Sequence, residues 1–351
     1  MTLLRLLTII GFSVPATLFG AAAAAADDAA RLFADHEILE LTMTAPMTEI
    51  MGERFYDEDS PGRLTYTDPE AGEVTLDIGV RTRGRYRRQY SVCRFAPLRL
   101  NFKKSETKNT LFEGSNKMKL VTHCRENSAR YSQAVLREYL AYRIFNLITD
   151  NSFRVRLLRV TYVDSESGDA NRDNFAFLIE HREQLAERLG LDVNRAEQTE
   201  VESLDGAFTN LGSMFQYLIG NTDFSAIRGA DGEVCCHNNV LFGAKEGEIL
   251  AIPYDFDMSG LVDAPYATPN PKFGLRSVKN RLYRGRCLND QYLEATALAF
   301  QERRADIYAL LASEYFDERS KRYLTRFVDE FFATLDDPKQ FDREIRSRCE
   351  K

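Results

Sequence analysis

The stretch IPYDFDMSG, residues 252–260, places two aspartates directly after an apolar segment. Residues 248–255 read as a short strand, so Asp255 lies at its end and Asp257 two residues beyond. Ionised carboxylates at the end of a buried strand lose solvation free energy unless a positive group meets them. The stretch therefore predicts a cation, such as a metal ion, beside these two aspartates.

Two other polar positions are expected to converge on the same place. A predicted apolar helix ends at Gly220, and Asp223 follows three residues later in a loop. The segment NNVLFG, residues 238–243, reads as a second strand, and a glycine-containing turn at 245–247 would join it to the strand 248–255. Such a hairpin would bring together Asp223, Asn239 and Asp255.

This set of side chains suits phosphoryl transfer. The reaction needs a carboxylate that orients the acceptor hydroxyl and takes its proton. It also needs Mg²⁺ on the phosphates, and Mg²⁺ binds hard oxygen ligands such as Asp and Asn. Protein kinases meet these needs with an Asp, an Asn and a second Asp, in that order along the chain. Asp223, Asn239 and Asp255 follow the same order.

At this point the sequence resembles a family. The segments IGNTDFS, NNVLF and IPYDFDMSG are similar to motifs of the CotH-type spore-coat kinases, and also to those of the HipA-type kinases. The resemblance covers roughly residues 74–265. It implies an α+β, protein-kinase-like bilobal fold, in which a small antiparallel sheet lobe with one long helix precedes a mainly helical C-terminal lobe.

The resemblance also implies roles for individual residues and for cofactors. Asp223 would be the catalytic Asp, and the cofactors would be Mg²⁺ or Mn²⁺ with ATP. Lys119 would bind nucleotide phosphates and Glu138 would hold that lysine, with Arg99 and Lys117 as alternatives to Lys119. The implied metal ligands are Asn239 (or Asn238 if the register shifts by one), Asp255 and Asp257.

The sequence departs from the kinase pattern in two places. About ten extra residues separate Asp223 from Asn239, and Cys235 and Cys236 at their end are expected to attach this insertion to the body of the protein. The loop RGRYRRQYS, residues 83–91, has one glycine and four arginines where kinases have a glycine-rich loop. These arginines would either clamp phosphate or be solvated.

Hydrophobic periodicity predicts the elements around the motifs. Alternating or apolar segments predict strands, and the 3.6-residue spacing of Leu136, Leu140, Ile144 and Leu147 predicts a helix with Ser128 at its N-cap. If the strands 96–104 and 116–124 pair antiparallel, Cys93 and Cys124 lie within disulfide reach. The predicted strands are 74–84, 96–104, 116–124, 154–164 and 174–181, and the predicted helices are 128–150, 182–190 and 206–220, with helical structure again from about residue 288.

The N-terminus predicts export. Residues 1–26 have one charge, an apolar run and small residues at Ala24 and Ala26, which is the pattern of a cleaved secretory signal peptide. The predicted organisation is a signal peptide (1–26), a lead-in (27–73), a small sheet-rich lobe (74–183) and a helical lobe (184–351). The six cysteines are an even number, which in a periplasmic or secreted protein favours disulfides over a metal site.

Charge and composition limit the partners. The formal net charge is -7, which argues against nucleic acid as a partner, and no segment after residue 26 is long and apolar enough for a membrane anchor. The leading hypothesis is an exported, metal- and nucleotide-dependent kinase or nucleotidyl transferase that acts on a protein or small hydroxyl acceptor. The alternatives are a non-catalytic, pseudokinase-type binding module of the cell envelope and a metal-dependent hydrolase that uses Asp255 and Asp257.

Overall fold

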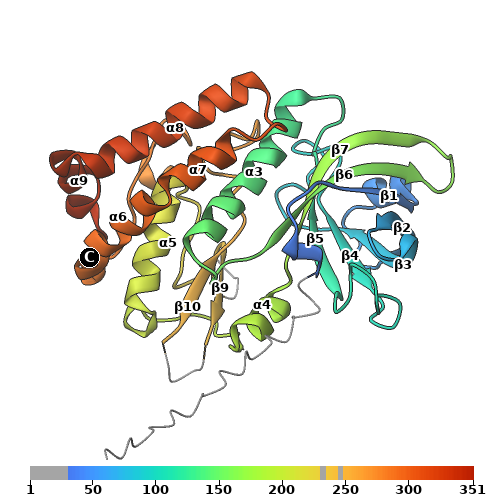
Figure 1. Cartoon of the computed structure of the whole chain (residues 1–351), viewed down its shortest axis with the longest axis horizontal. Coiled ribbons are helices and arrows are strands. Elements are labelled where there is room, and N and C mark those ends of the chain that lie inside the picture. The colour runs from blue at the N-terminus through green and yellow to red at the C-terminus, as the bar shows by residue number, and fades with distance from the viewer. Residues whose placement is uncertain (1–30, 230–234, 244–247) are drawn as a thin grey trace, which may run out of the picture.

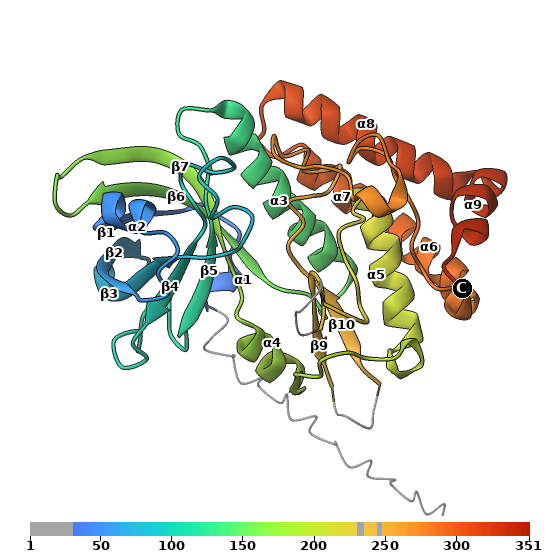
Figure 2. The same cartoon turned by 180° about the vertical axis from the view of Figure 1, so that it is seen from behind.

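A computed structural model describes residues 31–229, 235–243 and 248–351 of the chain. The predicted signal peptide (1–26) and the predicted turn at 245–247 lie outside the described residues. A β-barrel forms one side of the molecule and helices form the other, with the long helix α3 (Ala129–Ile148) running between them (Figures 1 and 2). Every helix in the described part is too short or too polar to span a bilayer.

The barrel closes in the order β1-β2-β3-β4-β5-β7-β6. All neighbouring strands pair antiparallel except β1 and β6, which pair parallel and close the barrel with Leu39 opposite Leu158. The strands are β1 (Leu39–Ala45), β2 (Ser60–Asp68), β3 (Gly72–Thr82), β4 (Leu98–Phe102), β5 (Lys117–Val121), β6 (Val155–Asp164) and β7 (Ala170–Ile179).

This closed barrel corrects the expected fold. The chain is α+β, but the small antiparallel sheet lobe of a kinase-like bilobal fold was wrong, because the sheet has seven strands and no open edge. Residues 27–73, expected as a lead-in, supply β1 and β2. These two strands close the barrel because β1 pairs with β2 on one side and with β6 on the other.

Apolar and polar side chains alternate along the strands, so the apolar ones fill the barrel and the polar ones point outside. Leu98, Leu100 and Phe102 of β4 are buried in the barrel core, as their predicted common face requires. The intervening Arg99 therefore points outward. On β7, Ala176 and Leu178 join the barrel core while Phe177 and Ile179 join the core around α3. The apolar run at the end of β7 follows from burial on both faces.

Helix α3 is buried on all sides in its middle. Residues 134–145 are buried without a break, including Glu138. The predicted stripe of Leu136, Leu140 and Ile144 accounts for only one face of this helix. The other faces of α3 contact β6, β7 and helix α7, so polar side chains on α3 lie inside the protein rather than in water.

The rest of the chain is mainly helical around a small sheet of order β10-β9-β8. Helix α5 begins after Asp205, whose side chain accepts a bond from the Phe208 amide, and ends at Gly220 in the left-handed conformation, φ 63°. The remaining strands are β8 (Val193–Asn194), β9 (Asn239–Phe242) and β10 (Leu250–Pro253). The other helices are α1 (Arg31–Ala34), α2 (Met47–Gly52), α4 (Arg182–Leu189), α5 (Gly206–Ile219), α6 (Leu293–Glu302), α7 (Arg304–Leu311), α8 (Glu318–Asp336) and α9 (Pro338–Glu344).

All six cysteines form disulfides. The predicted Cys93–Cys124 pair is confirmed, with 4.7 Å between the Cα atoms, because β4 and β5 pair antiparallel as expected. Cys287 bonds Cys349. Cys235 bonds its neighbour Cys236, so the expectation that these cysteines attach the insertion to the body of the protein was wrong.

Candidate functional site

The end of helix α5 fixes the position of Asp223. The left-handed Gly220 turns the chain out of the helix, and the buried Asn221 side chain donates to Gln216 Oε1 at 2.9 Å. The same side chain accepts a hydrogen bond from the Asp223 backbone amide, also at 2.9 Å. The loop that carries Asp223 is thus held by the helix before it.

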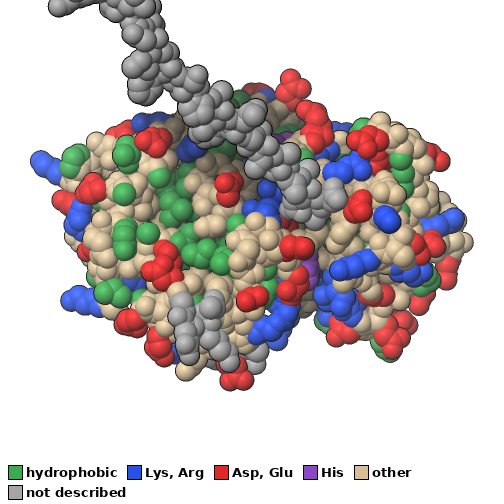
Figure 3. Space-filling model, turned by 60° about the horizontal axis from the view of Figure 1, so that its bottom comes forward, with side chains coloured by type: hydrophobic (Ala, Val, Ile, Leu, Met, Phe, Trp, Pro, Cys, Tyr) green, Lys and Arg blue, Asp and Glu red, His purple; other side chains and the backbone are tan. Residues whose placement is uncertain are grey.

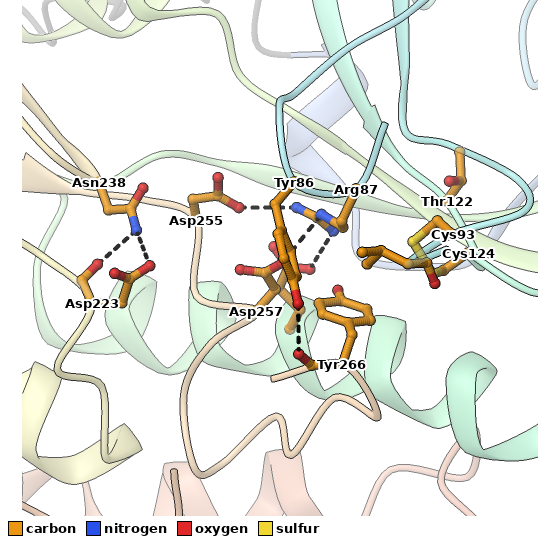
Figure 4. Close-up of polar contacts among 12 residues, drawn as sticks. Tyr86, Arg87, Cys93, Thr122, Cys124, Asp223, Asn238, Asp255, Asp257 and Tyr266 are labelled. Atoms are coloured by element: carbon orange, nitrogen blue, oxygen red, sulfur yellow. Dashed lines mark hydrogen bonds and ion pairs between the residues drawn. A yellow bond between two sulfur atoms is a disulfide. The ribbon is translucent and has the colours of Figure 1, made fainter. Parts of the chain in front are cut away.

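The Asp223 carboxylate is bonded to the start of β9. His237 Nε2 lies 2.9 Å from Asp223 Oδ1. The Asn238 amide donates to Asp223 Oδ2 at 3.1 Å and to its backbone carbonyl at 2.6 Å (Figure 4). About a third of the Asp223 side chain is exposed, 31%. This carboxylate is therefore oriented by the protein and still open to a ligand.

The β9–β10 hairpin brings Asn239 close to Asp255. Asn239 pairs with Pro253 in the register of the two strands, and the Tyr254 amide donates to the Asn238 carbonyl at 3.0 Å. Asp255 follows in the left-handed conformation, φ 62°, and its amide donates to the Tyr142 hydroxyl at 2.8 Å. The structure thus brings Asp223, Asn239 and Asp255 to one end of the hairpin.

Arg87 lies at the centre of three carboxylates in the same region. Its Nη2 is 3.0 Å from Asp255 Oδ1, its Nε is 3.2 Å from Asp257 Oδ2 and its Nη1 is 3.3 Å from Glu138 Oε2 (Figure 4). The Arg87 side chain is only 7% exposed. The cation that the sequence predicts beside Asp255 and Asp257 is, in this structure, a guanidinium.

The sequence singled out the loop of Arg87 but not this residue. The loop 83–91 has four arginines, and only the fold decides which one turns inward. The available signal was the demand for a cation: Glu138 on a buried helix and two aspartates after a strand need a positive partner. The Cys93–Cys124 disulfide lies just beyond this loop and fixes its far end to the end of β5 (Figure 4).

Burial shifts the pKa values of these carboxyl groups in different directions. Burial, followed by the charges of Asp257 and Asp255 and opposed by Arg87, raises the pKa of Glu138. Burial also raises the pKa of Asp257, although Arg87 opposes it. Burial acts in the same direction on Asp255, but the positive charges of Arg87, Arg83 and Lys119 outweigh it and lower that pKa. Asp255 is therefore the carboxylate best kept ionised for a cationic ligand.

Lys119 lies on strand β5 of the barrel, and Glu138 is not its partner. Its Nζ lies 4.0 Å from the centre of the Tyr254 ring, whereas Glu138 bonds Arg87. Burial, with a further contribution from Arg83 and opposed by Asp255, lowers the pKa of Lys119 to about 7. The predicted support of Lys119 by Glu138 is thus replaced by an aromatic contact.

Lys119 belongs to a row of basic side chains on the outside of the barrel. Arg81 pairs with Arg99, and Arg99 pairs with Lys119, across three adjacent strands, so the three side chains share one face. We call these three residues the basic row. Basic and acidic side chains and a histidine gather along the hollow between the barrel and the helical side (Figure 3). Such a row is suited to a polyanion such as a nucleotide phosphate.

The residues of this site suit a metal ion that is also bound by a nucleotide, rather than a metal ion held by the protein alone. Within residues 31–229, 235–243 and 248–351, His, Cys, Asp and Glu form no group of three or more placed to hold a metal ion. Mg²⁺ on a nucleotide needs only one or two protein ligands besides phosphate oxygens. Asp255 contacts Arg87 through Oδ1, and the Asn239 amide nitrogen donates to the His237 carbonyl. Each of these two side chains keeps one oxygen outside those contacts, so both suit such an ion.

Comparison with known proteins gives little further information. No family model matches the chain, and no curated protein does. Among solved structures, the chain is similar to the crystal structure of a Helicobacter pylori proinflammatory kinase, CtkA. The match has 9% sequence identity and a TM-score of 0.38, and covers 82% of this chain and 93% of that one. A similarity this low assigns neither a family nor a function.

Proposed function

We propose that the protein is an exported, metal- and nucleotide-dependent phosphotransferase that acts on a hydroxyl group of a protein or a small molecule. The observation that supports it best is the convergence of Asp223, Asn239 and Asp255 at one end of the β9–β10 hairpin. Three disulfides support export, because such bonds persist in oxidising compartments.

Asp223 would orient the acceptor and take its proton. The acceptor oxygen forms a bond to the terminal phosphorus of the nucleotide, the bond from that phosphorus to the bridging oxygen breaks, and the nucleoside diphosphate leaves. The hydroxyl proton passes to Asp223, which His237 and Asn238 hold in place.

Asp255 and Asn239 would hold Mg²⁺ or Mn²⁺ against the nucleotide phosphates, and the bound ion would supply charge neutralisation there. Lys119, Arg99 and Arg81 of the basic row would bind the phosphates from the barrel side. Asp257, which Arg87 already neutralises, would support Asp255 rather than bind the ion itself.

Thermal unfolding of the mature protein with Mg²⁺ or Mn²⁺, with and without ATP, tests this proposal. A ligand that binds only the folded state raises the unfolding temperature. We expect a rise only when metal and nucleotide are both present, and its loss in Asp255→Ala. Asp77→Ala, which removes an exposed carboxylate of β3, is the matched control and should respond like the wild type. A full response of Asp255→Ala would contradict the assignment of the metal site.

One observation favours a second function, a non-catalytic binding module of the cell envelope. Arg87 pairs with one oxygen each of Asp255, Asp257 and Glu138, so these carboxylates have a cation beside them without any ligand. Such a module would show either no response to nucleotide or a response that does not need metal. It would also transfer no phosphate to any acceptor, which a radiolabelled nucleotide assay detects.

A further inference from the structure

A second charged site lies away from the β9–β10 hairpin, between the first turns of α3 and helix α8. It is a groove of about 870 Å³. Among the side chains that line it are Arg130, Gln133 and Arg137 from α3, and Arg319, Arg322 and Arg326 from α8. We call this site the arginine groove.

These six side chains form two stripes, one on each helix. Residues 130, 133 and 137 have the spacing i, i+3, i+7, and residues 319, 322 and 326 repeat it, so each set shares one face of its helix. Seven residues of helix rise roughly 10 Å. A peptide in the extended polyproline II conformation has three residues per turn and rises about 3.1 Å per residue, so side chains three positions apart lie on one side of it, roughly 9 Å apart.

The exposed arginines of the groove lack carboxylate partners. In the described part of the chain, Arg130, Arg319, Arg322 and Arg326 form no ion pair, in contrast to the two lysines of the groove. Lys279 pairs with Asp263 at 2.9 Å, and Lys321 pairs with Glu318 at 3.3 Å. The groove therefore keeps an excess of positive charge, although the chain as a whole is acidic, with a net charge of -7.

Arg137 is the strongest indication of a ligand. It is 6% exposed and lines the groove, so its guanidinium is buried in the wall. Its Nε donates to the Gln133 carbonyl at 3.2 Å, and its ring contact is with Tyr323. No carboxylate of the described residues lies within ion-pair distance of it. Asp263 and Asp317 stabilise its charge only from a distance, so a buried guanidinium without a directly paired carboxylate is a site that an anionic group of a ligand would complete.

We propose that the arginine groove binds an extended acidic peptide segment of a partner protein. Its length, the two stripes and the buried Arg137 suit carboxylates about three residues apart. Nucleic acid suits it less well, because it carries a charge on every nucleotide that would also meet Asp263, Asp317 and Asp329 of the groove, whereas a peptide can carry uncharged residues there. This inference does not rest on the proposed function, since it concerns binding without nucleotide or turnover.

Fluorescence anisotropy with a labelled peptide that carries glutamate at every third position tests the inference on the mature protein. The decisive variant is Arg322→Glu/Arg326→Glu, because both side chains are exposed and the buried face of α8 is untouched. The matched control is Lys104→Glu/Arg172→Glu, which changes the net charge equally at two exposed barrel positions. Circular dichroism and the unfolding temperature confirm that both variants fold.

We expect the groove variant to bind the peptide at least about tenfold more weakly, which is the loss of roughly one charge-assisted hydrogen bond. The control should bind within about twofold of the wild type at roughly 0.15 M salt, where distant charges are screened. Equal loss in both variants, or no loss in either, would overturn the proposal.

Two further measurements complete the test. Arg137→Gln should also weaken peptide binding. If a folded Arg137→Gln protein bound the peptide with unchanged affinity, Arg137 would not contact the peptide and the proposal would be contradicted. A single-stranded oligonucleotide of the same charge serves as the alternative ligand. If it binds more tightly than the peptide and the groove variant abolishes that binding, the class of partner is wrong.

Discussion

Arg87 Nη2 lies 3.0 Å from Asp255 Oδ1, and this contact joins the loop between β3 and β4 to the residue that follows β10. The two residues are 168 positions apart in the chain. Asp257 and Glu138 complete the cluster around the same guanidinium. A charge cluster of this kind is sensitive to the removal of either sign, because the buried charges left behind, Glu138 and Asp257, have little water to solvate them.

Replacement of Arg87 by Met should therefore destabilise the protein strongly. Three carboxylates would be left without their cation, and breaking a buried pair in this way lowers the unfolding free energy by about 3–5 kcal/mol. Urea unfolding at pH 7 measures the loss. Arg172→Met, at an exposed position of β7, is the control and should change the unfolding free energy by less than about 0.5 kcal/mol.

The deficit of Arg87→Met should shrink as the pH falls. Burial already raises the pKa of Glu138 to about 8 and that of Asp257 to about 6, and removal of Arg87 raises both further. The folded variant then binds more protons than the unfolded chain, so its stability decreases as pH rises from about 4.5 through 8. A deficit as large at pH 5 as at pH 8 would show that Arg87 contributes packing and not charge.

The Cys93–Cys124 disulfide should stabilise the loop of Arg87. It closes a loop of sequence separation 31, which in the chain-entropy model contributes about 3–4 kcal/mol. Cys93→Ala/Cys124→Ala should lower the unfolding free energy by an amount of that order and speed proteolysis within residues 83–97. Cys287→Ala/Cys349→Ala is the matched control: it should also lower stability but leave proteolysis of that loop unchanged, and similar cleavage in both would contradict the local role.

Lys119 should make stability rise with pH in the alkaline range. Its pKa is about 7 in the folded protein, against an ordinary value of 10.5, so between these values the unfolded chain holds a proton that the folded protein lacks. Stability therefore increases as pH rises from 7 toward 10.5. Lys119→Met should reduce this slope in urea titrations at several pH values, whereas Lys104→Met, at an exposed site, should leave it unchanged.

Local periodicity predicted most elements correctly, because each pattern is contained in one segment. Strands β4 and β5, helix α5 and the β9–β10 hairpin all lie within the predicted ranges. Strands β1 and β2 were missed because turn-rich sequence surrounds them. Closure of the barrel depends on the parallel pairing of β1 with β6, which brings Leu39 to Leu158, and no local pattern specifies such a distant contact.

In the candidate site, too, the features that depend on local sequence were predicted and those that depend on distant contacts were not. Asp223, Asn239 and Asp255 were predicted to converge because each follows or begins an element whose pairing is local. The position of Arg87 was not predictable, since the choice among four arginines depends on how the loop packs onto α3 and the segment after β10. Lys119 and Glu138 were assigned to each other, but the structure gives Glu138 to Arg87.

The proposed roles of Asp223 and Asp255 can be separated by substitution. Asp223→Asn removes the negative charge but keeps a side chain that can bond Asn238 and His237, so the fold should be intact. Because Asp223 would act on the acceptor proton, transfer to an acceptor should fall by roughly 10²–10⁴-fold. The rise in unfolding temperature with Mg²⁺ and ATP should remain, because Asp255 and Asn239 would hold the ion.

Asp255→Asn is the paired variant for the same assays, and it should lose both the transfer activity and the rise in unfolding temperature. The contrast is informative, since the two aspartates lie near the same end of the β9–β10 hairpin and would contact different ligands. If Asp223→Asn abolished the nucleotide response as completely as Asp255→Asn, Asp223 would be a nucleotide-binding residue. Its assignment as the group that receives the acceptor proton would then be wrong.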